Sequence, residues 1–228
     1  ARLTLLEDLY SDFNRRELAY PDPVEFLYAY DDHLDREIIA LIASALAYGR
    51  VGGIRHSVQW VLDRLPSPRS DICGGSAARI ACAMAGFRHR FTTDRELTNL
   101  LVGIQSVFLC HGSLRACFLR GLSSGDRTTV GALEYLVTEL NPSRQRTSLL
   151  PPPSQGSACK RLHLFLRWLV RRDHVDPGGW DEVGSDRLIV PLDTHMHRLA
   201  RRLGLTARRC ANAGTAGEVT EGFRALRP

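Results

Sequence analysis

The sequence predicts an all-α protein. Apolar residues recur mostly at helical spacing, while the clear alternation that marks β-strands is scarce. Clusters of proline and glycine separate the helical stretches. The 228 residues, 44 % of them hydrophobic, are enough to bury a full core. We therefore expect one helical unit over residues 1–228.

Three helices are expected in the first third of the chain. Residues 3–19 carry leucine and aromatic residues spaced for one helix face, and the prolines that follow end this helix. Asp35 is placed to cap a helix over 36–48. That helix is apolar on nearly every side, so it should lie at the centre of the core. A glycine-rich loop over 49–53 leads to a third helix over 54–65.

Further helices are expected near residues 76–85, 94–110, 128–140 and 159–172. The proline-rich stretch 141–158 is expected to be a loop that delivers the chain to the last of these. Leucine and phenylalanine at i, i+3, i+4 and i+7 should face the core from helix 159–172. The opposite stripe of this helix carries Lys160, His163, Arg167 and Arg171.

The final predicted helix begins at Asp193 and ends at Gly204. Its inward residues should be Met196, Leu199, Ala200 and Leu203, and its outward residues His195, Arg198 and Arg202. Aspartate is a favoured N-cap residue, so capping alone is one complete interpretation of Asp193. His195 and His197 lie about 200° apart around this helix, which does not favour a shared metal ion.

Lysine occurs once in the chain, at Lys160, whereas 29 of the 30 basic residues are arginine. Arginine serves where a fixed positive charge is enough, but its guanidinium stays protonated and does not attack carbon. A position that keeps lysine therefore indicates a nucleophilic amine. The alternative interpretation is codon bias in a GC-rich genome, with one lysine retained by chance.

The excess positive charge is concentrated in the C-terminal third. Residues 160–209 contain 11 basic and 6 acidic residues, which accounts for the net charge of +5 of the whole chain. Such a region is typical of a polyanion-binding surface, although a solvated basic helix face explains it equally well. None of the six cysteines forms a Cys-x-x-Cys pair, and no apolar run approaches membrane-spanning length. We expect a cytoplasmic monomer without a metal or cofactor and without a membrane partner.

Two segments together resemble the helix-hairpin-helix (HhH-GPD) DNA glycosylase superfamily, which includes endonuclease III and the archaeal 8-oxoguanine DNA glycosylases. The run 191–205, Pro-Leu-Asp-Thr-His-Met-His-Arg-Leu-Ala-Arg-Arg-Leu-Gly-Leu, is similar to the family's aspartate motif. Gly156 followed by Lys160 resembles the hairpin and lysine of the family. The run 37–48 is similar to its long N-terminal core helix. The chain is also similar to a bacterial family of conserved proteins of unknown function, a divergent branch of this superfamily.

The resemblance implies a two-lobed fold with the active site between lobes 30–140 and 1–29 plus 141–228. It implies a DNA repair enzyme with glycosylase and abasic-site lyase activity, acting on damaged duplex DNA with an oxidised purine as the expected base. Lys160 would be the catalytic nucleophile and Asp193 its catalytic partner. The residues expected to contact DNA are Gly156, Ser157, Arg161, His195, Arg198 and Arg202. Tyr48 or Arg50 would fill the gap left by the flipped base.

The sequence departs from the family pattern at several points. Ala158 stands where the hairpin usually has its second glycine, and no glutamine follows the core helix near Tyr48. Lys160 and Asp193 are 33 residues apart, which is longer than in endonuclease III. The cysteines of the iron–sulfur tail are missing.

Two other functions therefore stay open. A non-catalytic DNA- or RNA-binding protein of the same fold predicts salt-dependent binding that survives loss of Lys160. A helical scaffold for protein partners predicts no appreciable affinity for DNA at low salt.

Overall fold

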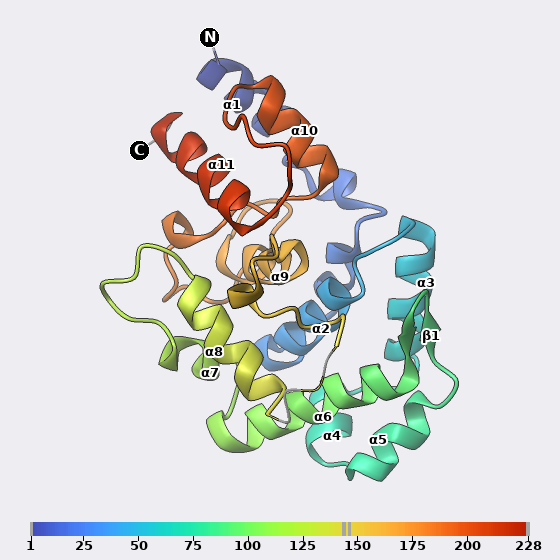
Figure 1. Ribbon diagram of the computed structural model, residues 1–228. Helices are drawn as coiled ribbons and strands as arrows, with labels where there is room; N and C mark the ends of the chain where they lie inside the picture. The colour runs from blue at the N-terminus through green and yellow to red at the C-terminus, as the bar shows by residue number, and fades with distance from the viewer. Residues whose placement is uncertain (1, 143–144, 146, 227–228) are drawn as a thin grey trace.

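The computed structural model describes residues 2–142, 145 and 147–226, and its architecture is all-α, as predicted (Figure 1). Helices account for 62 % of the structure. The α-helices are α1 (Arg2–Phe13), α2 (His33–Ala45), α3 (Val51–Leu62), α4 (Pro68–Cys73), α5 (Ala77–Met84), α6 (Asp94–His111), α7 (Leu114–Arg120), α8 (Val130–Leu140), α9 (Lys160–Val170), α10 (Thr194–Arg202) and α11 (Ala213–Leu226). The short 3-10 helices are η1 (Arg16–Ala19), η2 (Pro23–Ala29), η3 (Pro153–Gln155) and η4 (Ser185–Arg187).

Sequence periodicity missed a two-stranded antiparallel sheet. Strands β1 (Arg88–His89) and β2 (Thr92–Thr93) pair in the register Arg88 with Thr93 and His89 with Thr92. Two residues per strand are too few to produce a detectable alternation. The hairpin packs beside α3 and leads directly into α6 (Figure 1).

Helix α2 lies at the centre of the main core, as its sequence predicts, and every residue from Glu37 to Ala45 is buried. The predicted cap is wrong by one turn. Asp32, not Asp35, accepts hydrogen bonds from the backbone N–H groups of Leu34 and Asp35, so the helix begins at His33. The Asp35 carboxylate instead accepts from the backbone N–H of Arg69 at 2.8 Å, which joins α2 to α4. Because Asp32 caps the helix, the Asp35 side chain in the first turn is free to make this contact with another helix.

The buried residues form two cores, and α9 belongs to the larger one together with α2. The smaller core joins α10 and α11 to the segments that precede α9 and α10; its buried members are Ala158, Ile189, Leu192, Ala200, Ala216 and Val219. Helix α9 packs against α2 in the larger core, while α10 lies in the smaller one. The junction between the cores therefore falls between α9 and α10, the helices that carry Lys160 and Asp193.

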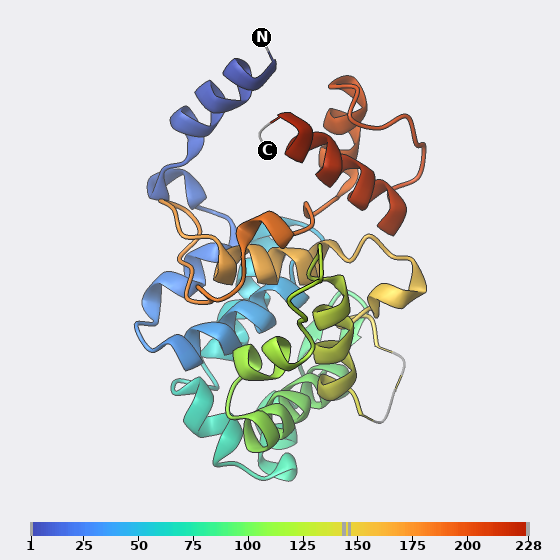
Figure 2. The same cartoon turned by 90° about the vertical axis from the view of Figure 1, so that its left-hand side faces the viewer.

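The apolar face predicted for residues 3–19 is not buried. Helix α1 ends at Phe13, and its side chains Leu5, Leu9 and Phe13 are exposed. Figure 2 shows α1 and the α10–α11 pair projecting from the same end of the molecule. Periodicity identified the start of this helix, but it ends at Phe13 rather than at the prolines. A 3.6-residue pattern also does not specify which neighbour covers the apolar face.

No single helix in the described part of the chain is long and apolar enough to cross a membrane. One pair, α6 and α7, meets the length and composition criteria when taken together, and it is bent by 69°.

The buried carboxyl group of Glu37 joins α2 to α7. Its side chain is 1 % exposed, and Oε2 accepts a hydrogen bond from the backbone N–H of Arg115 at 2.8 Å. Oε1 has no hydrogen-bond partner among the residues that the structure describes. Burial raises the pKa of Glu37 from 4.5 to about 7, and the nearby backbone N–H and charge of Arg115 oppose this shift.

We expect Glu37 to make the protein less stable as pH rises. Below pH 4.5 the carboxyl is protonated in the folded and unfolded chains alike; between pH 4.5 and about 7 the unfolded chain releases the proton first. The free energy of unfolding should therefore fall by on the order of 3 kcal/mol across this window. Urea unfolding from pH 5 to 8 should show wild type losing most of this amount relative to Glu37→Gln. If the free energy of unfolding changed equally with pH in the two proteins, Glu37 would not be the group responsible.

Candidate functional site

Lys160 is the first residue of α9, and the turn before it contains two residues in the left-handed conformation. Gly156 has φ 78°, and Cys159 at the N-cap has φ 43°. The Gly156 carbonyl accepts a hydrogen bond from the backbone N–H of Ala213 at 3.0 Å. The turn is therefore attached to the start of α11, and this contact fixes where the Lys160 side chain leaves the backbone.

The other residues of this turn are also held by the C-terminal helices. Ser157 is exposed and forms an antiparallel bridge with Asn212, and its hydroxyl accepts a hydrogen bond from the backbone N–H of Cys159 at 3.3 Å. Ala158 is buried in the smaller core. The methyl group at position 158, where the resemblance expects a glycine, is thus part of the packing between the turn and α11.

Asp193 is the N-cap of α10, as predicted. Its Oδ1 accepts a hydrogen bond from the backbone N–H of Met196 at 2.8 Å, which satisfies one of the free donors at the helix start. The predicted stop is also correct, because Gly204 follows the helix with φ 68°. Capping occupies one carboxylate oxygen, and the second oxygen faces α9.

The two predicted catalytic residues lie side by side. Lys160 Nζ is 3.8 Å from Asp193 Oδ2, and each side chain is 35 % exposed. This distance is an ion-pair contact that is too long for a direct hydrogen bond. An ion pair this open to solvent contributes about 0–1 kcal/mol to stability, so the fold does not depend on it. The amine and the carboxylate are accessible to a ligand and close enough to act on the same reacting atom.

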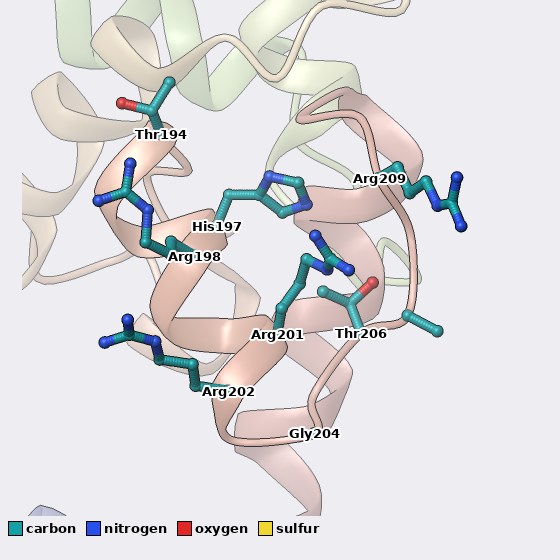
Figure 3. A pocket seen from close by; sticks show the side chains of 9 residues that line it. Thr194, His197, Arg198, Arg201, Arg202, Gly204, Thr206 and Arg209 are labelled. Atoms are coloured by element: carbon teal, nitrogen blue, oxygen red, sulfur yellow. The ribbon is translucent and has the colours of Figure 1, made fainter.

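Four arginines line an open depression of about 810 Å³ that begins at Thr194, the residue after Asp193 (Figure 3). We call Arg198, Arg201, Arg202 and Arg209 the α10 arginine surface. In Figure 3, Arg198 and Arg202 follow one edge of α10, while Arg201 lies on the edge that faces the loop carrying Arg209.

All four arginines of this surface are exposed, and none forms an ion pair with a described residue. The predicted DNA contact His195 is exposed in the first turn of the same helix. Uncompensated arginines that line one depression form a surface of positive potential that attracts a polyanion. The arrangement therefore offers anion-binding groups immediately beside the Lys160–Asp193 pair.

Arg161, which was expected to contact DNA, is engaged within the protein. Its guanidinium donates hydrogen bonds to the carbonyl oxygens of Ala45 and Ser148 and lies 5.0 Å from the ring centroid of Tyr48. Burial lowers the pKa of this guanidinium. The side chain joins the start of α9 to the end of α2 and so supports the site from within the protein. We therefore assign it no contact with a DNA phosphate.

Tyr48 is half-buried and held from several sides. Its hydroxyl donates to the carbonyl of His89 at 2.9 Å and lies 2.5 Å from Thr92 Oγ1. Its ring stacks on Phe91, with centroids 4.9 Å apart and planes 25° apart. Arg50 is exposed in the loop before α3. Tyr48 and Arg50 are the two residues expected to fill the gap left by a flipped base. The Tyr48 ring is covered by Phe91, whereas Arg50 is exposed.

His163 differs from its expected position on the polar stripe of α9. The side chain is 5 % exposed, and its Nδ1 has no hydrogen-bond partner in the described part of the chain. Burial lowers the pKa of His163 to about 4, so the ring is neutral at physiological pH. The neutral ring therefore adds no positive charge beside Lys160, one turn earlier on a stripe that also carries Arg167 and Arg171.

Sequence reasoning missed three exposed side chains, two of them beside the site. Arg201 and Arg209 complete the α10 arginine surface, and the run of adjacent arginines at 201–202 and 208–209 was a visible signal for them. Phe91 lies on the β1–β2 hairpin and is 60 % exposed. No local pattern marks it, because its exposure follows from a hairpin that the periodicity does not detect.

Comparison with known proteins identifies a family for this chain. Residues 22–228 match the family model DUF2400, described as a protein of unknown function. No curated protein and no solved structure matches the chain. The matched segment covers nearly the whole chain and contains both Lys160 and Asp193. The chain therefore belongs to the DUF2400 family.

Proposed function

We propose that this protein is a DNA glycosylase with abasic-site lyase activity that uses Lys160 as its nucleophile. The observation that carries the proposal is the contact between the only lysine of the chain and Asp193, whose Oδ2 lies 3.8 Å from Nζ. A lysine amine held beside a carboxylate, partly exposed and next to an anion-binding surface, is a pattern suited to Schiff-base chemistry on a phosphodiester substrate.

The proposed reaction begins with a nucleotide turned out of the duplex stack, since its C1′ is otherwise out of reach. Lys160 Nζ attacks C1′ after giving a proton to Asp193. The bond from C1′ to the base nitrogen breaks, and the base leaves with the bonding electrons and takes up a proton. Opening of the sugar ring gives a Schiff base between Nζ and C1′. Loss of a C2′ proton then releases the 3′ phosphate. The proton that the base takes up comes from Asp193, and the regenerated carboxylate then stabilises the positive charge that develops on the sugar.

The proposal includes a divergent, two-lobed HhH-GPD fold. In support, the turn 156–159 leads directly into the lysine helix, as a hairpin does in that superfamily, and α10 begins at the aspartate. The junction of the two cores lies between α9 and α10. A damaged purine is the proposed base, and this part rests on the sequence resemblance.

Borohydride trapping tests the lyase proposal. Wild type and Lys160→Gln are mixed with duplexes that carry 8-oxoguanine or an abasic site, and the reductant converts any Schiff base into a stable protein–DNA adduct. We expect an adduct with wild type and none with the variant. No adduct with either protein would overturn the lyase proposal. An adduct with both would assign the amine to another group, such as the chain's N-terminus.

A non-catalytic DNA-binding protein is the second candidate, and the α10 arginine surface favours it equally. It predicts DNA binding by wild type and Lys160→Gln with equal affinity, and no adduct with either. The same pair of proteins therefore separates the two functions.

Salt dependence tests the α10 arginine surface directly. For a double variant Arg198→Ala/Arg202→Ala, we expect the slope of log Kobs against log salt to become shallower by about 2, because each lost phosphate contact removes about 0.9. The matched control is Arg79→Ala, because Arg79 is exposed on α5 and forms no ion pair with a described residue; α5 lies at the opposite end of the molecule from α10 (Figure 1). Equal slopes for the double variant and the control would exclude this surface from the interface.

A further inference from the structure

The β1–β2 hairpin presents an aromatic ring to solvent. The two residues between the strands are Arg90, whose φ is 54°, and Phe91, which is 60 % exposed. Burying a phenylalanine side chain stabilises a protein by about 1.5–3 kcal/mol. A ring left outside the core therefore contributes little to folding at this position.

The inner side of the Phe91 ring rests on a fixed platform. Tyr48 stacks against it at 4.9 Å, and the Tyr48 hydroxyl is held by the His89 carbonyl and Thr92. His89 contacts Tyr48 edge-on at 4.6 Å, and its Nδ1 lies 2.8 Å from Ser57 Oγ. The Tyr48 ring is thus held in place by its neighbours, while the Phe91 ring stays exposed to solvent.

Three arginines lie on the segments that carry the two stacked rings: Arg88 and Arg90 beside Phe91 in the hairpin, and Arg50 two residues after Tyr48. Arg50, Arg88 and Arg90 are exposed, and none forms an ion pair with a residue that the structure describes. The neighbouring carboxylate of Asp94 is occupied by the backbone N–H groups of Gly86 and Arg95. An exposed aromatic ring among uncompensated arginines fits a nucleic-acid base flanked by its phosphates.

The stack is connected to the candidate site through one residue. Arg161, which follows Lys160, lies over the Tyr48 ring at 5.0 Å and donates to the Ala45 carbonyl. Figure 1 shows the hairpin and α10 on different sides of α2 and α9.

We propose that Phe91, stacked on Tyr48, is a binding subsite for one unpaired DNA base, with Arg50, Arg88 and Arg90 holding the adjacent phosphates. This inference rests on the proposed DNA-directed function and adds a position for a base outside the Lys160–Asp193 pair. Stacking on an aromatic side chain is tolerant of base identity, because every base presents a flat face. The subsite therefore recognises that a base is unpaired, irrespective of its sequence.

Replacing Phe91 with alanine tests the subsite, with Phe13→Ala as the matched control, since Phe13 is 63 % exposed on α1. The probes are a duplex with one unpaired 2-aminopurine and the same duplex fully paired. We expect Phe91→Ala to weaken binding of the first probe by roughly 5- to 100-fold and to remove the quenching of 2-aminopurine. Binding of the paired duplex should stay within about 3-fold of wild type, because its phosphate contacts are intact. Phe91→Trp should restore both signals.

Equal affinity and quenching for wild type and Phe91→Ala would overturn the subsite, as would failure of wild type to prefer the unpaired probe. The trapping experiment separates this inference from the proposed chemistry. A Lys160-dependent adduct with no effect of Phe91→Ala would remove the subsite and leave the lyase. A strong effect of Phe91→Ala without any adduct would remove the lyase and keep a protein that binds unpaired bases.

Discussion

The variant Lys160→Arg is expected to keep DNA binding and to lose the covalent chemistry. Arginine retains the positive charge beside Asp193, whose Oδ2 lies 3.8 Å from the native amine. Its guanidinium does not deprotonate to attack C1′, so the lyase rate should fall by at least about 10⁴-fold. Affinity for an abasic-site duplex should remain within about 3-fold of wild type, because the charge is kept. Single-turnover strand cleavage and fluorescence anisotropy measure the two effects.

The 29 arginines of the chain make this substitution informative. Arginine is the residue that the chain uses at every other basic position, so Lys160→Arg is what codon bias alone would favour. Cleavage at a rate close to wild type would show that the amine is dispensable and would support chance retention of lysine. Loss of cleavage together with loss of DNA binding would instead indicate a positional effect on the whole interface.

The variant Asp193→Asn is expected to separate catalysis from helix capping. Asparagine caps helices about as well as aspartate, so its side-chain oxygen should still accept from the Met196 backbone N–H. The free energy of unfolding should change by no more than about 0.5 kcal/mol. Because the amide neither accepts the Lys160 proton nor stabilises positive charge on the sugar, the lyase rate should fall by about 10²- to 10⁴-fold. Thermal unfolding and single-turnover cleavage provide the two readouts.

Asp193→Ala is the companion variant for this experiment. It removes the charge and the cap together, so it should match the rate loss of Asp193→Asn and also cost about 0.5–2 kcal/mol of stability. If the two variants were equally stable, the cap would have no energetic role. If Asp193→Asn cleaved DNA as fast as wild type, capping would be the whole function of Asp193.

Much of the secondary structure could be predicted from periodicity and end signals. The helices around 94–110 and 128–140 and the helix capped by Asp193 occur within a few residues of their expected positions. The error at the start of α2 arose because a tertiary contact overrides a local preference. Asp35 has the chemistry of a cap, yet the structure uses Asp32 for that purpose and gives Asp35 to the Arg69 backbone. A local pattern identifies residues able to cap a helix without deciding between two of them.

The chemical identity of the candidate site was determined by the sequence. One lysine among 29 arginines, an aspartate at a helix start and an excess of charge confined to residues 160–209 are all readable without coordinates. They are local properties, because a side chain's chemistry and a helix N-terminus depend on the residue itself and its near neighbours in the chain.

Tertiary structure alone decided which of these side chains meet and which are buried. Packing of α9 in the larger core and of α10 in the smaller one brings Lys160 to Asp193 across 33 residues of sequence. The same packing draws Arg161 inward to two carbonyl oxygens and leaves Phe91 exposed on Tyr48. The physical reason is that burial is a property of the neighbours that the fold supplies, and periodicity records only that a helix has an apolar face.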